Sequence, residues 1–152
     1  MAYIAPALRA LVSERSHSRC EYCLTAQAIV VEMEVDHVVP ESAGGQTTSD
    51  NLCQTCVGCN GFKLAFQTAV DPETGEETPL YHPRVDRWGA HFRWSEDGTL
   101  IVGVTAAGRA TVARLQMNRP RIIEARRLWV RAGWHPPAVA TFTTASDPGR
   151  LE

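Results

Sequence analysis

Two pairs of cysteines constrain this chain more than any other feature of its sequence. Each pair has the spacing Cys-x-x-Cys, at Cys20/Cys23 and at Cys56/Cys59, and 32 residues separate the pairs. One such pair presents two thiolates to an ion, so two pairs supply the four ligands of a tetrahedral structural zinc site. Two redox-active dithiols and reduced core cysteines are the alternatives. We favour zinc because disulfide frameworks are rare in cytosolic proteins.

The fifth cysteine makes the second pair ambiguous. Cys53 lies three residues before Cys56, so Cys53/Cys56 competes with Cys56/Cys59 as the second half of the site. Spacing alone leaves both pairings open. If Cys56/Cys59 holds the ion, we expect Cys53 to be a buried thiol.

Length and composition indicate one folded domain in the cytoplasm. The chain has 152 residues, of which 44% are hydrophobic and 21% charged, enough apolar surface for a core. We expect no membrane span, because no apolar run approaches eighteen residues, and no signal peptide, because Met1–Val12 lacks a basic start. The net charge of −2 argues against a globally basic nucleic-acid binder.

The charge is nevertheless unevenly distributed. Residues 109–131 carry seven arginines and a single acid, Glu124. On a helix in this region, Arg121, Arg127 and Arg131 share one side and are candidate contacts to nucleic acid. The alternative is an ordinary solvated helix face in an arginine-rich protein.

Periodicity predicts a mixed chain of helices and short strands. In the first half we expect a helix over 6–16, a strand over 33–38, a loop over 42–49, a short strand or turn over 51–55 and a helix over 60–69. An acidic turn over 71–79 follows. In the second half we expect a hairpin of two strands, over 91–94 and 99–104, and then helices over 108–117 and 118–132. Asn118 is the expected cap of the last helix, and Gly98 the tip of the hairpin. The expected division is a core over 1–70, an extension over 71–135 and a flexible tail over 136–152.

The residues that carry chemistry lie between and just after the two cysteine pairs. Asp36 and His37 stand together at the end of the expected strand, whose alternation sends their side chains in different directions. A carboxylate such as Asp36 suits Mg²⁺. An imidazole such as His37 suits a general base that deprotonates water. Downstream lie Asn60, directly after Cys59, and Lys63, the only lysine of the chain.

In order and spacing, this pattern resembles the zinc-containing branch of the HNH endonucleases. It reads Cys20-x-x-Cys23, Asp36-His37-Val-Val-Pro40, Gly44-Gly45, Asn51-Leu52 and Cys56-x-x-Cys59-Asn60-x-x-Lys63, and spans about residues 19–66. The resemblance implies an α+β fold in which a small ββα-metal core is clamped by a four-cysteine zinc site, with an N-terminal helix and a C-terminal hairpin and two-helix extension. The resemblance also favours Cys56/Cys59 as the second cysteine pair of the zinc site, since in the family an asparagine directly follows that pair. Residues 79–134 resemble the extension of a bacterial subgroup.

The resemblance also implies residue roles. Asp36 and Asn60 would bind a catalytic Mg²⁺ or Mn²⁺, and His37 would be the general base. Asn51 would orient the histidine or brace the metal-binding loop, and Lys63 would face the phosphate. Two residues are possible third or outer ligands: Glu34, which stands where relatives carry a histidine, and His82.

The expected function is therefore metal-dependent hydrolysis of phosphodiester bonds in nucleic acid, with DNA the favoured partner and the oligomeric state open. The alternatives are an inactive zinc module that binds nucleic acid and a redox or zinc-handling dithiol protein.

Overall fold

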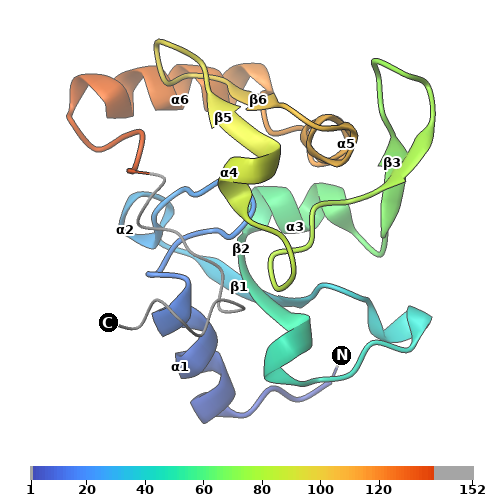
Figure 1. The fold of residues 1–152 in the computed structure, drawn as a ribbon. Coiled ribbons are helices and arrows are strands. Elements are labelled where there is room, and N and C mark those ends of the chain that lie inside the picture. Colours follow the sequence, from blue (N-terminus) through green and yellow to red (C-terminus); the bar gives the residue numbers. More distant parts are fainter. Residues whose placement is uncertain (1, 139–152) are drawn as a thin grey trace.

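The computed structural model describes residues 2–138 of the chain and shows a mixed α+β architecture (Figure 1). The flexible tail expected over 136–152 therefore lies almost wholly outside the described residues. Two short 3₁₀ turns occupy Glu41–Ala43 and Ser49–Asn51. The helices are α1 (Pro6–Arg15), α2 (Gln27–Val30), α3 (Val57–Lys63), α4 (Trp88–His91), α5 (Ala106–Arg114) and α6 (Pro120–Arg131). The strands are β1 (Met33–His37), β2 (Leu52–Cys56), β3 (Thr68–Val70), β4 (Glu77–Pro79), β5 (Phe92–Trp94) and β6 (Ile101–Gly103).

The centre of the molecule is a ββα unit made of β1, β2 and α3. The strands pair antiparallel, with Asp36 opposite Cys53 and His37 opposite Leu52. Every residue of β2 is buried, while β1 has one partly open face. Cys56 ends β2 and caps α3, because its sulfur accepts a hydrogen bond from the backbone N–H of Cys59. This confirms the ββα fold that the sequence predicts.

The helix predicted over 60–69 is wrong at both ends. α3 begins earlier, at Val57, because the cap on Cys56 starts it there. It ends at Lys63, since Leu64 takes a positive φ of 52° that breaks the helix. The chain then forms β3, which pairs with β4 across the segment predicted to be only an acidic turn. Asp71 closes that turn by accepting hydrogen bonds from the Glu73 N–H and the Thr74 hydroxyl.

The C-terminal part contains the predicted hairpin and two helices, with two corrections. The hairpin is β5 and β6, and Gly98 at its turn has a φ of +75°. Helix α5 starts at Ala106 rather than at 108, because the Thr105 hydroxyl caps it. Asn118 does not cap α6; its side chain instead bonds both the N–H and the C=O of Ile101. It thereby ties the start of α6 to the hairpin.

The main hydrophobic core joins the cysteines to the C-terminal part of the chain. It contains buried residues from the first knuckle, from β2 and α3, and from the segment 80–117. The indole N–H of Trp88, for example, donates to the Tyr22 carbonyl at 2.7 Å. A second, smaller cluster of Ile4, Val12 and Leu52 packs α1 against β2.

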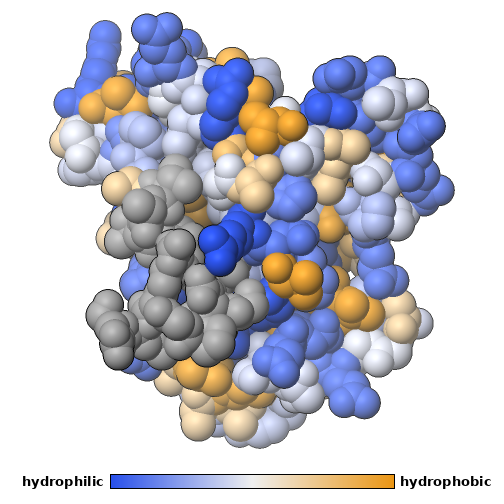
Figure 2. Space-filling view, viewed as in Figure 1, coloured by the Kyte–Doolittle hydropathy of each residue, from blue (hydrophilic) through white to orange (hydrophobic). Residues whose placement is uncertain are grey.

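The surface has little continuous apolar area on the side that Figure 2 shows. Hydrophobic residues there form separate small patches among hydrophilic ones. Within residues 2–138, none of the helices combines the length and the hydropathy that a membrane span requires.

Candidate active site and metal centre

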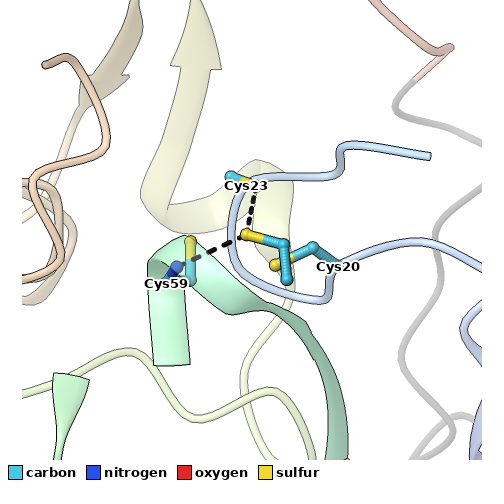
Figure 3. A group of neighbouring side chains, drawn as sticks. Cys20, Cys23 and Cys59 are labelled. Carbon is cyan, nitrogen blue, oxygen red and sulfur yellow. Dashed lines mark hydrogen bonds between the residues drawn. The ribbon is translucent and has the colours of Figure 1, made fainter. Parts of the chain in front are cut away.

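The two cysteine pairs meet at one point inside the protein. Cys20 and Cys23 come from a tight knuckle in which the Leu24 N–H donates to the Cys20 carbonyl. Cys56 and Cys59 come from the junction of β2 and α3. The four sulfur atoms all lie within 4.8 Å of one another, and all four residues are buried. Figure 3 shows Cys20, Cys23 and Cys59 facing one another across the two segments.

This donor set fits zinc. A tetrahedral ion with Zn–S bonds of about 2.3 Å separates its sulfur ligands by about 3.8 Å. The sulfur atoms of Cys23 and Cys56, which lie 3.7 Å apart, match one edge of such a tetrahedron. Hydrogen bonds from the neighbouring thiols, Cys20 first, lower the pKa of Cys23 well below its usual value, and a thiolate is the form that binds metal. One four-sulfur cluster also disfavours two separate redox dithiols.

Cys53 lies outside this cluster, as expected if Cys56 pairs with Cys59. It is fully buried, and its thiol contacts the hydroxyl of Tyr22 at 3.9 Å. Burial raises the pKa of Cys53 to about 12, so the thiol stays protonated. Of the two pairings that the spacing leaves open, the structure therefore brings Cys56/Cys59 into the cluster.

A second group of polar side chains lines a pocket of about 560 Å³ beside β1. Its lining includes the carboxylates Glu34 and Asp36, the imidazole of His37 and the amide of Asn60. Glu34 and Asp36 are two residues apart on β1 and share one face of the strand. The pocket therefore brings together two carboxylate residues, an amide residue and a histidine.

Helix α3 faces these carboxylates with two residues. Asn60 and Lys63 are three apart and lie on the same side of the helix. The Asn60 amide donates to the Glu34 carboxylate. The Lys63 ammonium contacts Asp36 Oδ2 at 3.1 Å and the His37 carbonyl at 3.3 Å. Two cross-links thus join β1 to α3. Lys63 is buried against Asp36, and its expected contact with a phosphate stays a prediction.

His37 is buried, and its ring is held by a residue that the sequence analysis missed. Its Nε2 lies 2.9 Å from the hydroxyl of Thr47. Thr47 belongs to the loop between β1 and β2, and nothing in its local sequence signals the contact. Since the imidazole makes no other hydrogen bond within the described part of the chain, Thr47 sets the orientation of the ring.

Asn51 braces the loop that carries Thr47. Its side chain accepts from the Val39 N–H and donates to the carbonyls of Val39 and Gln46, each at 2.9 Å. Gly45 permits this close packing, because a Cβ there would lie 1.8 Å from the Val39 oxygen. Of the two roles considered for Asn51, these contacts fit loop bracing.

The remaining candidates lie away from this pocket. His82 borders a different pocket, with Lys63 and Asp86; its Nδ1 accepts from the Arg84 N–H, and burial lowers its pKa. Arg121, Arg127 and Arg131 are exposed on α6, which Figure 1 shows well separated from β1. Arg126, between them, is fully buried and donates to the carbonyls of Thr99 and Met117.

Comparison with known proteins relates one segment of the chain to a family. A comparison with curated proteins and another with solved structures each found no match. Residues 20–64 match the model of the family described as HNH endonuclease. This segment contains both cysteine pairs and every residue of the pocket that comes from β1 and α3. The resemblance to the HNH endonucleases is therefore confirmed for residues 20–64, which are 45 of the 152 residues.

Proposed function

We propose that this protein is a metal-dependent nuclease that hydrolyses phosphodiester bonds, with DNA as the first substrate to test. One observation carries the proposal: Glu34, Asp36, His37 and Asn60 line a single pocket within the segment that matches the HNH family. A module that only binds nucleic acid has no need of a buried, oriented histidine beside oxygen donors.

The oxygen donors fit a hard divalent cation. Asp36 and Asn60 would hold Mg²⁺ or Mn²⁺, with Glu34 as a third or outer ligand, because carboxylate and amide oxygens are the donors that these ions prefer. When bound, the cation would neutralise the charge that develops on the phosphate and on the leaving oxygen. The open side of the pocket leaves room for the phosphodiester.

His37 would take the proton of the attacking water. If Nε2–H donates to the Thr47 hydroxyl, Nδ1 retains its lone pair and can accept a proton. Thr47 would fix this tautomer and the direction of the ring, and Asn51 would hold the loop from which Thr47 projects. A positioned general base of this kind contributes on the order of 10²–10⁴-fold in rate.

The arginines of α6 are proposed only as peripheral contacts. Arg121, Arg127 and Arg131 are exposed, but they belong to a different part of the molecule from β1. Their contact with the substrate requires a nucleic acid that extends from the pocket across the molecule. Such phosphate contacts would make binding weaker at high salt.

The test is cleavage of supercoiled plasmid and of single-stranded DNA by zinc-loaded protein, with Mg²⁺, with Mn²⁺ and with neither. We expect nicking that needs the added cation and that falls about 10²–10⁴-fold in His37→Asn. His17→Asn is the matched control, because His17 is exposed and does not line the pocket, and asparagine tolerates its φ of 53°.

Three outcomes decide the proposal. Cation-dependent nicking that His37→Asn abolishes and His17→Asn preserves supports it. Equal nicking by His37→Asn assigns the cut to a contaminant or to other residues. Folded, zinc-loaded protein that binds DNA without cutting any substrate favours the alternative, a nucleic-acid-binding module.

A further inference from the structure

Lys63 contacts a carboxylate, that of Asp36, to which the proposed metal would bind. It is the only lysine of the chain, and its side chain is 3% exposed. Its ammonium lies 3.1 Å from Asp36 Oδ2 and 3.3 Å from the His37 carbonyl. A buried ammonium is costly unless it is paired, so this contact is a specific feature of the site rather than a loose surface ion pair.

Glu34, the possible third ligand, is also engaged, because it accepts a hydrogen bond from the Asn60 amide nitrogen. In this arrangement one oxygen of each carboxylate is paired with a protein group, and the group on Asp36 is a cation. The pocket beside them remains open to solvent, and the Asp36 side chain is 21% exposed.

We infer that Lys63 is an exchangeable counter-ion of Asp36: it satisfies the carboxylate when no divalent cation is bound and is displaced when one binds. The inference rests on the proposed function, because it assumes that Asp36 is a metal ligand. It makes the charge at position 63 a determinant of metal affinity. The two cations compete, because Lys63 already holds Oδ2, one of the two Asp36 oxygens that a metal could use.

The structure also provides a place for the displaced side chain. Lys63 borders the second pocket, of about 350 Å³, which Asp86 and His82 also line. Asp86 is the carboxylate there, and a lysine side chain has enough rotatable bonds to turn toward it. We expect the exchange to be a rotation of the Lys63 side chain toward Asp86, whose carboxylate already accepts from the His82 N–H.

The first experiment uses the single lysine as its own reporter. Zinc-loaded wild-type protein is acetylated with an amine-reactive reagent, and modification at Lys63 is followed by mass spectrometry with and without saturating Mg²⁺. We expect Mg²⁺ to speed the modification by about fivefold or more, because the amine leaves its buried pair. In Asp36→Asn, modification should be fast and independent of Mg²⁺.

The second experiment measures metal affinity without any nuclease assay. Mn²⁺ is titrated into wild type, Lys63→Met and Lys63→Arg, and binding is followed by the loss of the free-ion electron paramagnetic resonance signal. We expect Lys63→Met to bind Mn²⁺ about tenfold more tightly, since a positive charge next to the ligand is gone. Lys63→Arg keeps that charge and should bind like the wild type.

The outcomes separate this inference from the proposed function. Mn²⁺ binding that Asp36→Asn abolishes, with unchanged affinity in Lys63→Met and unchanged acetylation in Mg²⁺, overturns the exchange and leaves the metal site in place. No Mn²⁺ binding by the wild type or by Lys63→Met overturns both. If Lys63→Met does not fold, the acetylation experiment on wild-type protein decides the inference alone.

Discussion

The two polar clusters of this protein are built from the same ββα unit but are satisfied in different ways. At the cysteine cluster, four thiols converge in the core, and the one other polar side chain that contacts a sulfur there, among the described residues, is Thr25, at 3.2 Å from Cys23. The second cluster, called the oxygen cluster here, consists of Glu34, Asp36, His37 and Asn60 beside β1. In it, Lys63 pairs with Asp36, and Asn60 pairs with Glu34. We therefore expect the sulfur cluster to depend on a bound ion, whereas at the oxygen cluster Lys63 already balances the charge of Asp36.

This difference matches the two jobs that the clusters would do. A structural metal is bound permanently, so a site with no internal substitute ties its occupancy to folding. A catalytic cation exchanges with solvent and substrate, and a site that remains satisfied in its absence keeps the fold intact between turnovers. The comparison predicts large effects on folding at the first cluster and smaller, local effects at the second.

Loss of the sulfur cluster should have the largest effect. Replacing one ligand, as in Cys59→Ala, or removing the ion with a strong chelator should unfold the protein. Structural zinc sites contribute on the order of 10 kcal/mol, comparable with the whole stability of a domain this size, about 5–15 kcal/mol. Zinc content by atomic spectroscopy, read beside circular dichroism, measures the coupling.

The matched control for that substitution is Cys53→Ala. Cys53 is buried in the same core but contributes no ligand, so its loss should cost about 1 kcal/mol and leave one zinc ion per chain. If Cys59→Ala folds with the wild-type melting temperature, the cluster is not a structural site, and the contrast with the oxygen cluster fails.

At the oxygen cluster, we expect a substitution that removes one charge of the Asp36–Lys63 pair to lower the free energy of unfolding. Asp36→Asn removes the anionic partner of the Lys63 ammonium, and we expect a loss of about 2–4 kcal/mol. For a chain of this length that corresponds to a fall of about 6–12 °C in the melting temperature. Scanning calorimetry of the zinc-loaded, magnesium-free protein measures it.

The double variant sharpens this comparison. Asp36→Asn with Lys63→Met removes both charges, so most of the lost stability should return. A double variant as unstable as Asp36→Asn alone would mean that packing, and not charge, joins β1 to α3 at this point.

Thr47 should affect catalysis more than stability. Thr47→Val keeps the shape of the side chain but removes the hydroxyl that lies 2.9 Å from His37 Nε2. We expect cleavage to fall about 10–100-fold, because the ring loses the partner that fixes its tautomer and direction, with a small change in melting temperature. Thr47→Ser retains the hydroxyl and should retain most of the rate. Equal rates in Thr47→Val and the wild type would remove Thr47 from the site.

The sequence predicts the residues that gather in both clusters, partly from local signals and partly from the family resemblance, which gave Asn60 its role and favoured Cys56/Cys59. The Cys-x-x-Cys spacing indicates a metal knuckle, and Asp36-His37 at a strand end indicates the oxygen cluster. The ββα core follows in the same way. Periodicity predicts neither the cap on Cys56 nor the break at Leu64, since both depend on local backbone geometry.

The contacts that satisfy the oxygen cluster were not predictable. Lys63 reaches Asp36 and Thr47 reaches His37 only after folding sets the register of β1 against β2 and α3. Arg126 shows the same limit: the pattern of α6 places an arginine on a polar face, but three hydrogen-bond acceptors from the adjoining segments bury it. Burial of a charged residue is a tertiary effect that spacing does not reveal.

The ion pair of Asp71 and Arg109 provides the smallest expected effect and a control for Asp36 and Lys63. In each pair one side chain is nearly buried and the other partly open: Asp71 is 0% and Arg109 23% exposed. Asp71, however, is held by two contacts from Arg109, at 2.9 and 2.8 Å, and by the turn that follows it. No metal pocket among the described residues includes it, so Mg²⁺ should not change its contribution to stability.

The stability that this ion pair contributes should fall as the pH is lowered. Hydrogen bonds from Arg109 lower the pKa of Asp71 below its usual range, whereas the unfolded chain has a carboxyl pKa of about 3.9. The pair therefore stabilises the fold above about pH 4, and that stability is lost as the pH falls further and the unfolded state takes up the proton. The melting-temperature gap between wild type and Asp71→Asn should be constant from about pH 7 to 5 and narrow below about pH 4, with or without Mg²⁺. A gap that Mg²⁺ alters would show that the ion acts beyond the oxygen cluster, and would weaken the assignment of its effects to Asp36 and Lys63.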